Sequence, residues 1–180
     1  DKKGEINNLS KIIKPDLGII TNISYAHSKN FKNINEIAKA KAEIMNNIKK
    51  GGIVLLNKDD NFYINHKNFA LKKKLKVISF GIKSRFAMTK LIRIKKIKNK
   101  YELFINVNGL FVSFYSHNKN KSNIYNMLAT LATINLYIDV KKLQKHIFLN
   151  FKTPKGRGDI SKVKLKDKKI YFIDETYNSN

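Results

Sequence analysis

Short apolar runs alternate with stretches of helical periodicity in the first half of the chain. The runs at 17–22, 53–57 and 76–80 are rich in β-branched and other apolar residues and lead into polar or glycine positions, which is typical of buried strands. Apolar residues spaced three and four apart predict helices over about 33–48 and 61–73. This alternation predicts an α/β fold with a mainly parallel sheet and flanking helices.

One helix is predicted before the first strand, and an antiparallel unit after the third. Residues 5–14 carry apolar positions at helical spacing and end at Pro15, before which helix is disfavoured. From about 86 to 116 the pattern largely alternates, and Asn108-Gly109 is a two-residue hairpin turn. We therefore expect an antiparallel β-meander with its lysine-rich face in water. It carries no catalytic residue types, so we expect its role to be structural.

The last third of the chain predicts two helices and then two strands. The first helix is expected to be capped by Ser122, and the second to cover about 140–149. A linker containing proline and glycine precedes strands expected at 160–165 and 170–173. The predicted organisation is one α/β domain over 1–153, and from 154 to 180 a linker and the start of a second α/β domain. The buried face of the first helix is expected to hold Tyr125, Leu128, Ala129 and Ala132.

Lys41 is an anomaly in the helix that follows the first strand. At about 100° per residue it falls within the apolar stripe, whereas Lys39, Glu36 and Glu43 fall on the opposite, solvated face. A lysine in such a stripe commonly extends its ammonium group to water. Alternatively, a neutral lysine amine can react with carbon dioxide to form a carbamate, and its oxygens together with His27 of the preceding loop could hold a divalent cation. The stripe consists of Ile34, Ile37, Ala38, Ile44, Met45 and Ile48.

The order of these segments resembles that of the Mur ligases, the ATP-dependent amide ligases of peptidoglycan precursor synthesis. The resemblance implies that His27 binds magnesium and that Lys41, rather than Lys39, is carbamylated and is the second metal-binding residue. The matching pieces are Gly4-Glu5-Ile6, Pro15-Asp16, Thr21-Asn22-Ile23, Ala26-His27, Phe31 and Ile37-Ala38-Lys39-Ala40-Lys41-Ala42-Glu43-Ile44.

Further motifs of the same family imply a nucleotide site. Asn123 and Asn126 share one side of a first helical turn. As a bare pattern they are ordinary surface amides, but the resemblance places both near the adenine of ATP, with Ser122 where the family has histidine. Arg157, between two glycines, matches the family's G-R element. It is implied to contact the nucleotide phosphates and to stabilise charge during phosphoryl transfer.

The end of the chain resembles the family pattern D-D-x-Y-N-x-N-P, with Glu175 in place of the second aspartate. The nucleotide-binding residues implied there are Asp174, Glu175, Tyr177 and Asn178. Asn57-Lys58-Asp59-Asp60 corresponds to the family's N-x-D-D element, although asparagine and aspartate are ordinary turn residues.

The resemblance is greatest to those Mur ligases that add D-Ala-D-Ala to UDP-MurNAc-tripeptide, with ATP and Mg²⁺ as cofactors. It implies a cytoplasmic monomer that acts through an acyl phosphate. The open alternatives are another Mur-type ligase, such as a folylpolyglutamate synthase, and a basic, non-catalytic RNA-associated module. The chain contains no G-x-x-G-K-[ST] phosphate-binding loop. We therefore expect it to be a fragment that carries the second half of an ATPase site and is inactive alone.

Composition changes this interpretation little. The net charge of +24 would suggest nucleic-acid binding, but only Arg85, Arg93 and Arg157 are arginines among 37 basic residues. Arginine forks favour phosphate and base recognition, and here lysines are spread along the whole chain. We therefore expect no nucleic-acid partner. The absence of cysteine excludes disulfides and thiolate metal sites, and no apolar run approaches the roughly 18 residues of a membrane span.

Overall fold

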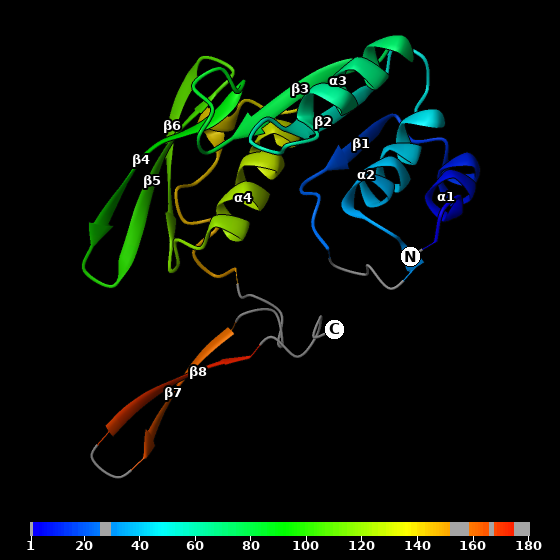
Figure 1. Ribbon diagram of the computed structural model, residues 1–180. Coiled ribbons are helices and arrows are strands. Elements are labelled where there is room, and N and C mark those ends of the chain that lie inside the picture. Colours follow the sequence, from blue (N-terminus) through cyan, green and yellow to red (C-terminus); the bar gives the residue numbers. More distant parts are fainter. Residues whose placement is uncertain (1, 26–29, 152–158, 166–167, 175–180) are drawn as a thin grey trace. The chain divides into compact units, whose positions relative to one another are not determined.

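A six-stranded sheet forms the centre of the larger part of the molecule (Figure 1). Its strands lie in chain order from β1 to β6. The neighbours from β1 to β4 are parallel, and those from β4 to β6 are antiparallel. The predicted parallel sheet and meander are thus joined into one sheet. The strands are β1 (Leu17–Ile20), β2 (Ile53–Asn57), β3 (Lys76–Gly81), β4 (Thr89–Ile97), β5 (Lys100–Val107) and β6 (Leu110–Ser116).

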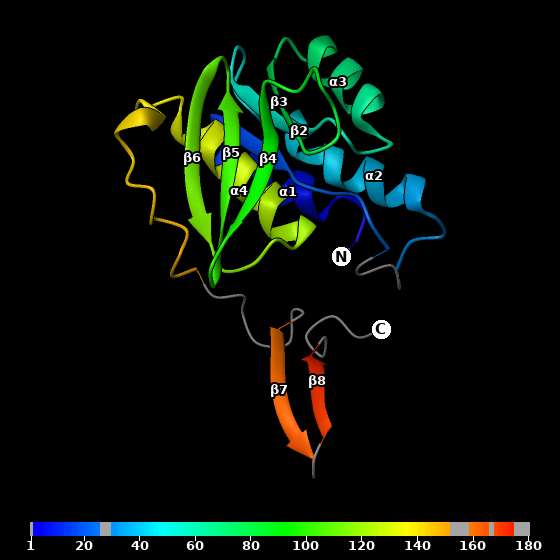
Figure 2. The same ribbon diagram turned by 90° about the vertical axis from the view of Figure 1, so that its left-hand side faces the viewer.

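Helices cover both faces of this sheet (Figure 2). Alternation along β2 directs Val54 and Leu56 into a core with α2 and α3, and Leu55 into a second core with α4. The second core continues beneath β5 and β6, where Leu103 and Phe114 are fully buried. The helices are α1 (Glu5–Ile13), α2 (Ile34–Ala42), α3 (Tyr63–Lys72) and α4 (Lys121–Ile134), with 3-10 turns η2 (Glu43–Asn46) and η3 (Val140–Lys142).

The computed structural model describes residues 2–25, 30–151, 159–165 and 168–174. The chain divides into two compact units, Asp1–Asn150 and Phe151–Asn180. The second unit contains an antiparallel hairpin of β7 (Asp159–Leu165) and β8 (Lys168–Asp174). Both strands were predicted. No helix of the described residues is long and apolar enough to cross a membrane.

The hairpin between β5 and β6 follows its sequence signature. Val107 and Leu110 pair on either side of Asn108 and Gly109, whose φ angles are 49° and 91°. Both values are positive, as a type I′ turn requires, and glycine adopts such a conformation without steric cost. The turn therefore sets the register of the whole β5–β6 pair.

Two helix predictions were wrong in part. The helix expected over 140–149 is only the short turn η3 followed by further turns. These turns pack against β6, where the Lys145 carbonyl accepts a hydrogen bond from the Tyr115 N–H at 2.8 Å. Ser122 is not the cap, since α4 begins at Lys121 and its N-cap position is Asn120. The buried face of α4 is as expected, except that Tyr125 is only half-buried.

Glu43 was placed wrongly on a solvated face. Glu43 follows α2 as the first residue of the 3-10 turn η2, and it is half-buried rather than solvated. Its carboxylate accepts hydrogen bonds from the N–H groups of Gly4 (2.8 Å) and Asn7 (3.2 Å). Glu43 therefore satisfies free donors at the N-terminus of α1.

Candidate functional site at the carboxyl end of the sheet

Lys41 lies beside the carboxyl end of β1. Its side chain is half-buried and lines a small cavity of about 140 Å³ together with Thr21 and Asn22. Lys39 is exposed and lines a different groove, between α2 and α3. The two lysines therefore lie on different sides of α2. The remaining lining residues of the small cavity are apolar: Ile6, Ile19, Ile20 and Ile44.

The two asparagines predicted to bind the nucleotide lie in the first turns of α4, and Asn126 is close to the same carboxyl end of β1. Asn126 and Thr21 line one cavity of about 340 Å³. Asn123 is half-buried, and its amide nitrogen donates to the side-chain oxygen of Asn118 at 2.9 Å. Thr21 thus adjoins both Lys41 and Asn126, so the predicted metal-binding lysine and one predicted adenine contact lie on two sides of the end of β1.

The Asn57-Lys58-Asp59-Asp60 segment ties together the loops at this edge. Asn57 is buried, and its amide nitrogen donates to the Thr21 carbonyl at 3.1 Å. The carboxylate of Asp60 accepts from the N–H of Ile23 at 2.9 Å and of Phe62 at 2.8 Å. The loop that continues from β1 toward residue 27 is therefore held by the end of β2.

Asp59 makes a second set of links, to the β3–β4 loop and to α4. Its carboxylate accepts hydrogen bonds from the N–H groups of Ile82 (2.6 Å), Lys83 (2.8 Å) and Ser84 (2.8 Å), and from the Tyr125 hydroxyl (3.0 Å). A Cβ atom at Gly81 would lie 3.0 Å from this carboxylate, so the close approach favours glycine there.

These contacts shift the pKa values of both Asp59 and Tyr125. Burial alone would raise the pKa of Asp59, but the three backbone N–H donors and the Tyr125 hydroxyl outweigh burial and hold that pKa below its usual value. Burial, followed by the hydrogen bond to Asp59 and the negative charge of that carboxylate, raises the pKa of Tyr125 to about 12. The pair is therefore a carboxylate and a neutral phenol at neutral pH.

Several predicted site residues lie outside the described residues. These are His27, Arg157, Glu175, Tyr177 and Asn178. Asp174 is the last residue of β8, and its side chain is also outside the described part. Among the residues that are described, no group of three or more His, Cys, Asp or Glu side chains could hold a metal ion.

Sequence reasoning missed Tyr125 as a polar partner and gave no role to Asp59. Tyr125 was assigned only to the buried face of its helix, and its hydroxyl meets Asp59 across 66 positions of sequence. The N-x-D-D resemblance was the available signal, but it carries no information about which backbone groups the carboxylates accept from.

Comparison with known proteins identifies related sequences. The Mur ligase middle domain family matches residues 1–134. A UDP-N-acetylmuramoyl-tripeptide–D-alanyl-D-alanine ligase of Rickettsia prowazekii is 31% identical over 161 residues, which cover 88% of this chain and 35% of the relative. A UDP-N-acetylmuramate–L-alanine ligase of Borreliella afzelii is 30% identical over 176 residues, with 89% and 35% covered. The chain thus spans about a third of the length of these relatives.

The fold is also found among solved structures. MurF from Acinetobacter baumannii superposes with a TM-score of 0.81 over 99% of this chain and 38% of its own, at 23% identity. At that identity the superposition establishes the shared fold.

Proposed function

This chain belongs to the Mur ligase family, and on that premise we propose that it is part of an ATP-dependent amide ligase of peptidoglycan precursor synthesis. The observation that supports an ATPase site most directly is the grouping of Lys41, Thr21 and Asn126 around the carboxyl end of β1. Ligands of open α/β sheets bind outside the carboxyl ends of the strands. Residues 1–153 would belong to the central ATP-binding domain, and 154–180 to a linker and the start of the C-terminal domain.

The proposed reaction has two steps. A carboxylate oxygen of the first substrate attacks the γ-phosphorus of ATP, which gives an acyl phosphate and ADP. The amine of the second substrate then attacks the acyl carbon, and the tetrahedral intermediate collapses with loss of inorganic phosphate and a proton. Arg157 would stabilise charge on the transferred phosphoryl group. Asn123 and Asn126 would contact the adenine, and the residues assigned to bind elsewhere on the nucleotide are Asp174, Glu175, Tyr177 and Asn178.

Lys41, as its carbamate, and His27 would hold a magnesium ion. The half-buried position of Lys41, next to the oxygen-bearing side chains of Thr21 and Asn22, fits this assignment, because magnesium prefers hard oxygen ligands. Asp59 and Asp60, the acids at the same edge of the sheet, are already engaged by backbone N–H groups, so a carbamate would supply the anionic oxygens that these carboxylates do not. When bound, the ion neutralises phosphate charge.

We further propose that the substrates are UDP-MurNAc-tripeptide and D-Ala-D-Ala, and that the ligase is a cytoplasmic monomer. Similarity to the Rickettsia relative and the motif resemblance support this choice. The Borreliella relative, named for L-alanine and UDP-N-acetylmuramate, is similar to a comparable degree. A ligase that joins L-alanine to UDP-N-acetylmuramate is therefore the second candidate.

An acceptor assay separates the two candidates. The full-length ligase is supplied with ATP and Mg²⁺, and phosphate release is measured with UDP-MurNAc-tripeptide plus D-Ala-D-Ala, and separately with UDP-MurNAc plus L-alanine. Phosphate release that requires the tripeptide and the dipeptide supports the first candidate. Release only with the second pair transfers the assignment to L-alanine addition, and release with neither pair contradicts both.

A further inference from the structure

Within the part of the chain that the structure describes, part of the outer edge of strand β6 is unpaired. It is the last strand of the sheet, and β5 pairs with it on one side only. Val107 and Leu110 flank a two-residue turn and so form a hydrogen-bonded pair. Because pairing alternates along an antiparallel strand, the backbone N–H and C=O groups of Phe111, Ser113 and Tyr115 point away from β5.

Part of this edge is already covered by a turn of the chain that includes Lys145. The N–H of Tyr115 donates to the Lys145 carbonyl at 2.8 Å, which confirms the outward direction of these groups. No described residue pairs with the backbone N–H of Phe111 or Ser113. Among the described residues, the edge therefore accepts one backbone partner at Tyr115 and has unpaired N–H groups nearer the hairpin turn.

A groove of about 540 Å³ lies beside the free part of the edge. Phe111 is exposed, and Val112 and Leu143 add apolar surface. Its cationic members are Arg93, Lys141 and Lys145, all exposed. The full lining is Ile92, Arg93, Phe104, Ile105, Phe111, Val112, Ser113, Phe114, Val140, Lys141, Leu143 and Lys145.

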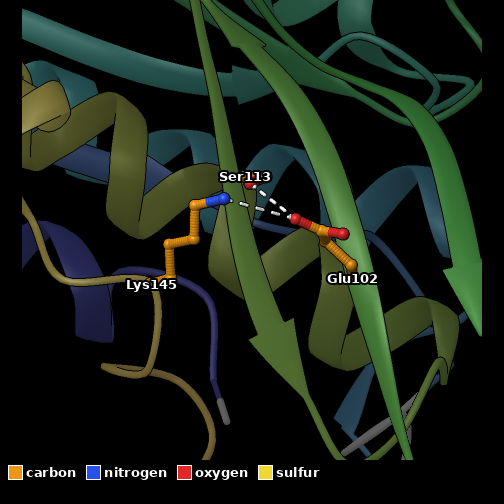
Figure 3. A network of polar contacts seen from close by, with 3 residues as sticks. All are labelled: Glu102, Ser113 and Lys145. Atoms are coloured by element: carbon orange, nitrogen blue, oxygen red, sulfur yellow. Dashed lines mark hydrogen bonds and ion pairs between the residues drawn. The ribbon is translucent and has the colours of Figure 1, made fainter. Parts of the chain in front are cut away.

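A polar network holds one wall of the groove in place (Figure 3). The buried carboxylate of Glu102 on β5 accepts a hydrogen bond from the Ser113 hydroxyl at 3.0 Å and lies 3.5 Å from the Lys145 ammonium group. Lys145 is thus tied to the sheet by its side chain as well as by its carbonyl. Arg93 lies with its guanidinium carbon 4.1 Å from the centre of the Phe104 ring, which positions a second cation on β4.

The surrounding charge selects the kind of strand that can bind. From residue 89 to residue 145 the chain carries eleven lysines and arginines but two acids, Glu102 and Asp139. A second copy of this chain, at a net charge of +24, would bring like charges to the edge. Lysines at sheet edges discourage such self-pairing. An acidic strand meets complementary charge instead.

We propose that the edge of β6 at Phe111–Ser113 is a docking site for an extended acidic peptide segment of another protein. The segment adds a strand to the sheet through the backbone groups of Phe111 and Ser113, in the manner of β-strand addition. Its acidic side chains face Arg93, Lys141 and Lys145, and its apolar side chains cover Phe111 and Leu143.

The test uses a fluorescent peptide of about eight residues that alternates valine and glutamate, the length of an ordinary strand. Fluorescence anisotropy should show binding that weakens as salt is raised. Phe111→Pro removes the outward N–H without removing a bond to β5, and should weaken binding at least about tenfold. Phe111→Ala keeps the N–H and should weaken binding less. Lys141→Glu should weaken binding, while a peptide with lysine in place of glutamate should not bind.

Two controls separate strand addition from simple charge attraction. A peptide of equal charge with proline at alternate positions cannot pair with the edge, and its equal binding would overturn the proposal. Hydrogen exchange provides a readout that needs no variant: the acidic peptide should slow exchange of the Phe111 and Ser113 amides. No binding, unchanged exchange at these two amides, or dimerisation of the chain through this edge would each contradict the assignment.

Discussion

Lys39 and Lys41 lie two positions apart on α2 and meet different surroundings. Lys39 is exposed in the groove between α2 and α3, whereas Lys41 is half-buried beside Thr21 at the end of β1. The helical turn of about 100° per residue explains this separation, since two positions differ by more than half a turn. Any chemistry at the carboxyl end of β1 is therefore within reach of Lys41 and not of Lys39.

If Lys41 is the proposed carbamate ligand, Lys41→Ala in the full-length ligase should abolish phosphate release, because the carbamate oxygens would be lost. Added acetate or formate should restore part of the activity by occupying the vacated position. Lys39→Ala is the matched control and should change activity less than about twofold, as exposed substitutions usually do. If Lys39→Ala inactivates the enzyme and Lys41→Ala does not, the metal site has been placed on the wrong face of α2.

Asp59→Asn should destabilise the chain by roughly 1–3 kcal/mol at pH 7, because an amide cannot accept all of the hydrogen bonds that the carboxylate accepts. The pKa of Asp59 is lowered on folding, so its stabilising contribution is present above the usual value of 3.8 and is lost as the pH falls through the lower folded pKa. Urea unfolding of both proteins from pH 7 down to about pH 3 should show the difference shrinking with acid.

Tyr125→Phe provides the control for this pair. It removes one of the four hydrogen bonds to Asp59, and should cost less, roughly 1 kcal/mol. The Tyr125 pKa of about 12 keeps the hydroxyl protonated at neutral pH, so the cost should be the same from pH 6 to pH 8. A stability difference for Asp59→Asn that grows in acid would show that the carboxylate is not held by these donors.

At the scale of elements, α1 is attached mainly through polar groups. Its apolar residues Leu9, Ile12 and Ile13 are 54%, 80% and 71% exposed, so they contribute little burial. Glu43 instead accepts from the Gly4 and Asn7 N–H groups at its N-terminus, where a negative charge also interacts favourably with the helix dipole. The attachment of α1 therefore depends on the Glu43 carboxylate together with the side-chain amides of Asn46 and Asn47, which donate to Asn7 and Ser10.

Glu43→Ala should loosen α1 without unfolding the sheet. Hydrogen exchange of the α1 amides should become about tenfold faster, which corresponds to ~1.4 kcal/mol of local stability, while the β5 and β6 amides should be unaffected. Glu36→Ala is the control, since the Glu36 carboxylate accepts a hydrogen bond from the backbone N–H of Lys32, in the segment just before α2. Equal effects of the two substitutions on α1 would show that Glu43 does not hold it.

At the scale of the whole molecule, the large positive net charge affects stability. A net charge of +24 produces self-repulsion that opposes the compact state. The ion pairs Lys49–Asp16 and Lys145–Glu102 each involve a lysine side chain that is more than half exposed, 59% and 55%. Such pairs contribute little, so salt removes more repulsion than attraction.

Raising sodium chloride from about 0.02 M to about 0.3 M should therefore increase the Tm by roughly 2–8 °C. Thermal unfolding followed by circular dichroism measures the shift. A variant with the exposed Lys95 and Lys96 changed to glutamine should begin with a higher Tm in low salt and gain less from added salt. A Tm that falls with salt would show that specific ion pairs outweigh the repulsion.

The sequence by itself determined the features that depend on local periodicity and turn chemistry. The three parallel strands, the Asn108-Gly109 hairpin and the position of Lys41 in an apolar stripe each follow from a repeat or from a two-residue signal. The family resemblance likewise named Lys41, Asn123 and Asn126 from short motifs. These predictions needed no knowledge of which residues distant in sequence come into contact.

Tertiary structure alone decided the features that depend on partners distant in sequence. Residues 140–149 have helical spacing but form turns against β6, where the Tyr115 N–H donates to the Lys145 carbonyl. Glu43 accepts from α1, and Asp59 accepts from Tyr125, across 39 and 66 positions of sequence. The physical reason is that a carboxylate or carbonyl accepts from whichever donor the fold brings near, and periodicity along the chain does not identify that donor.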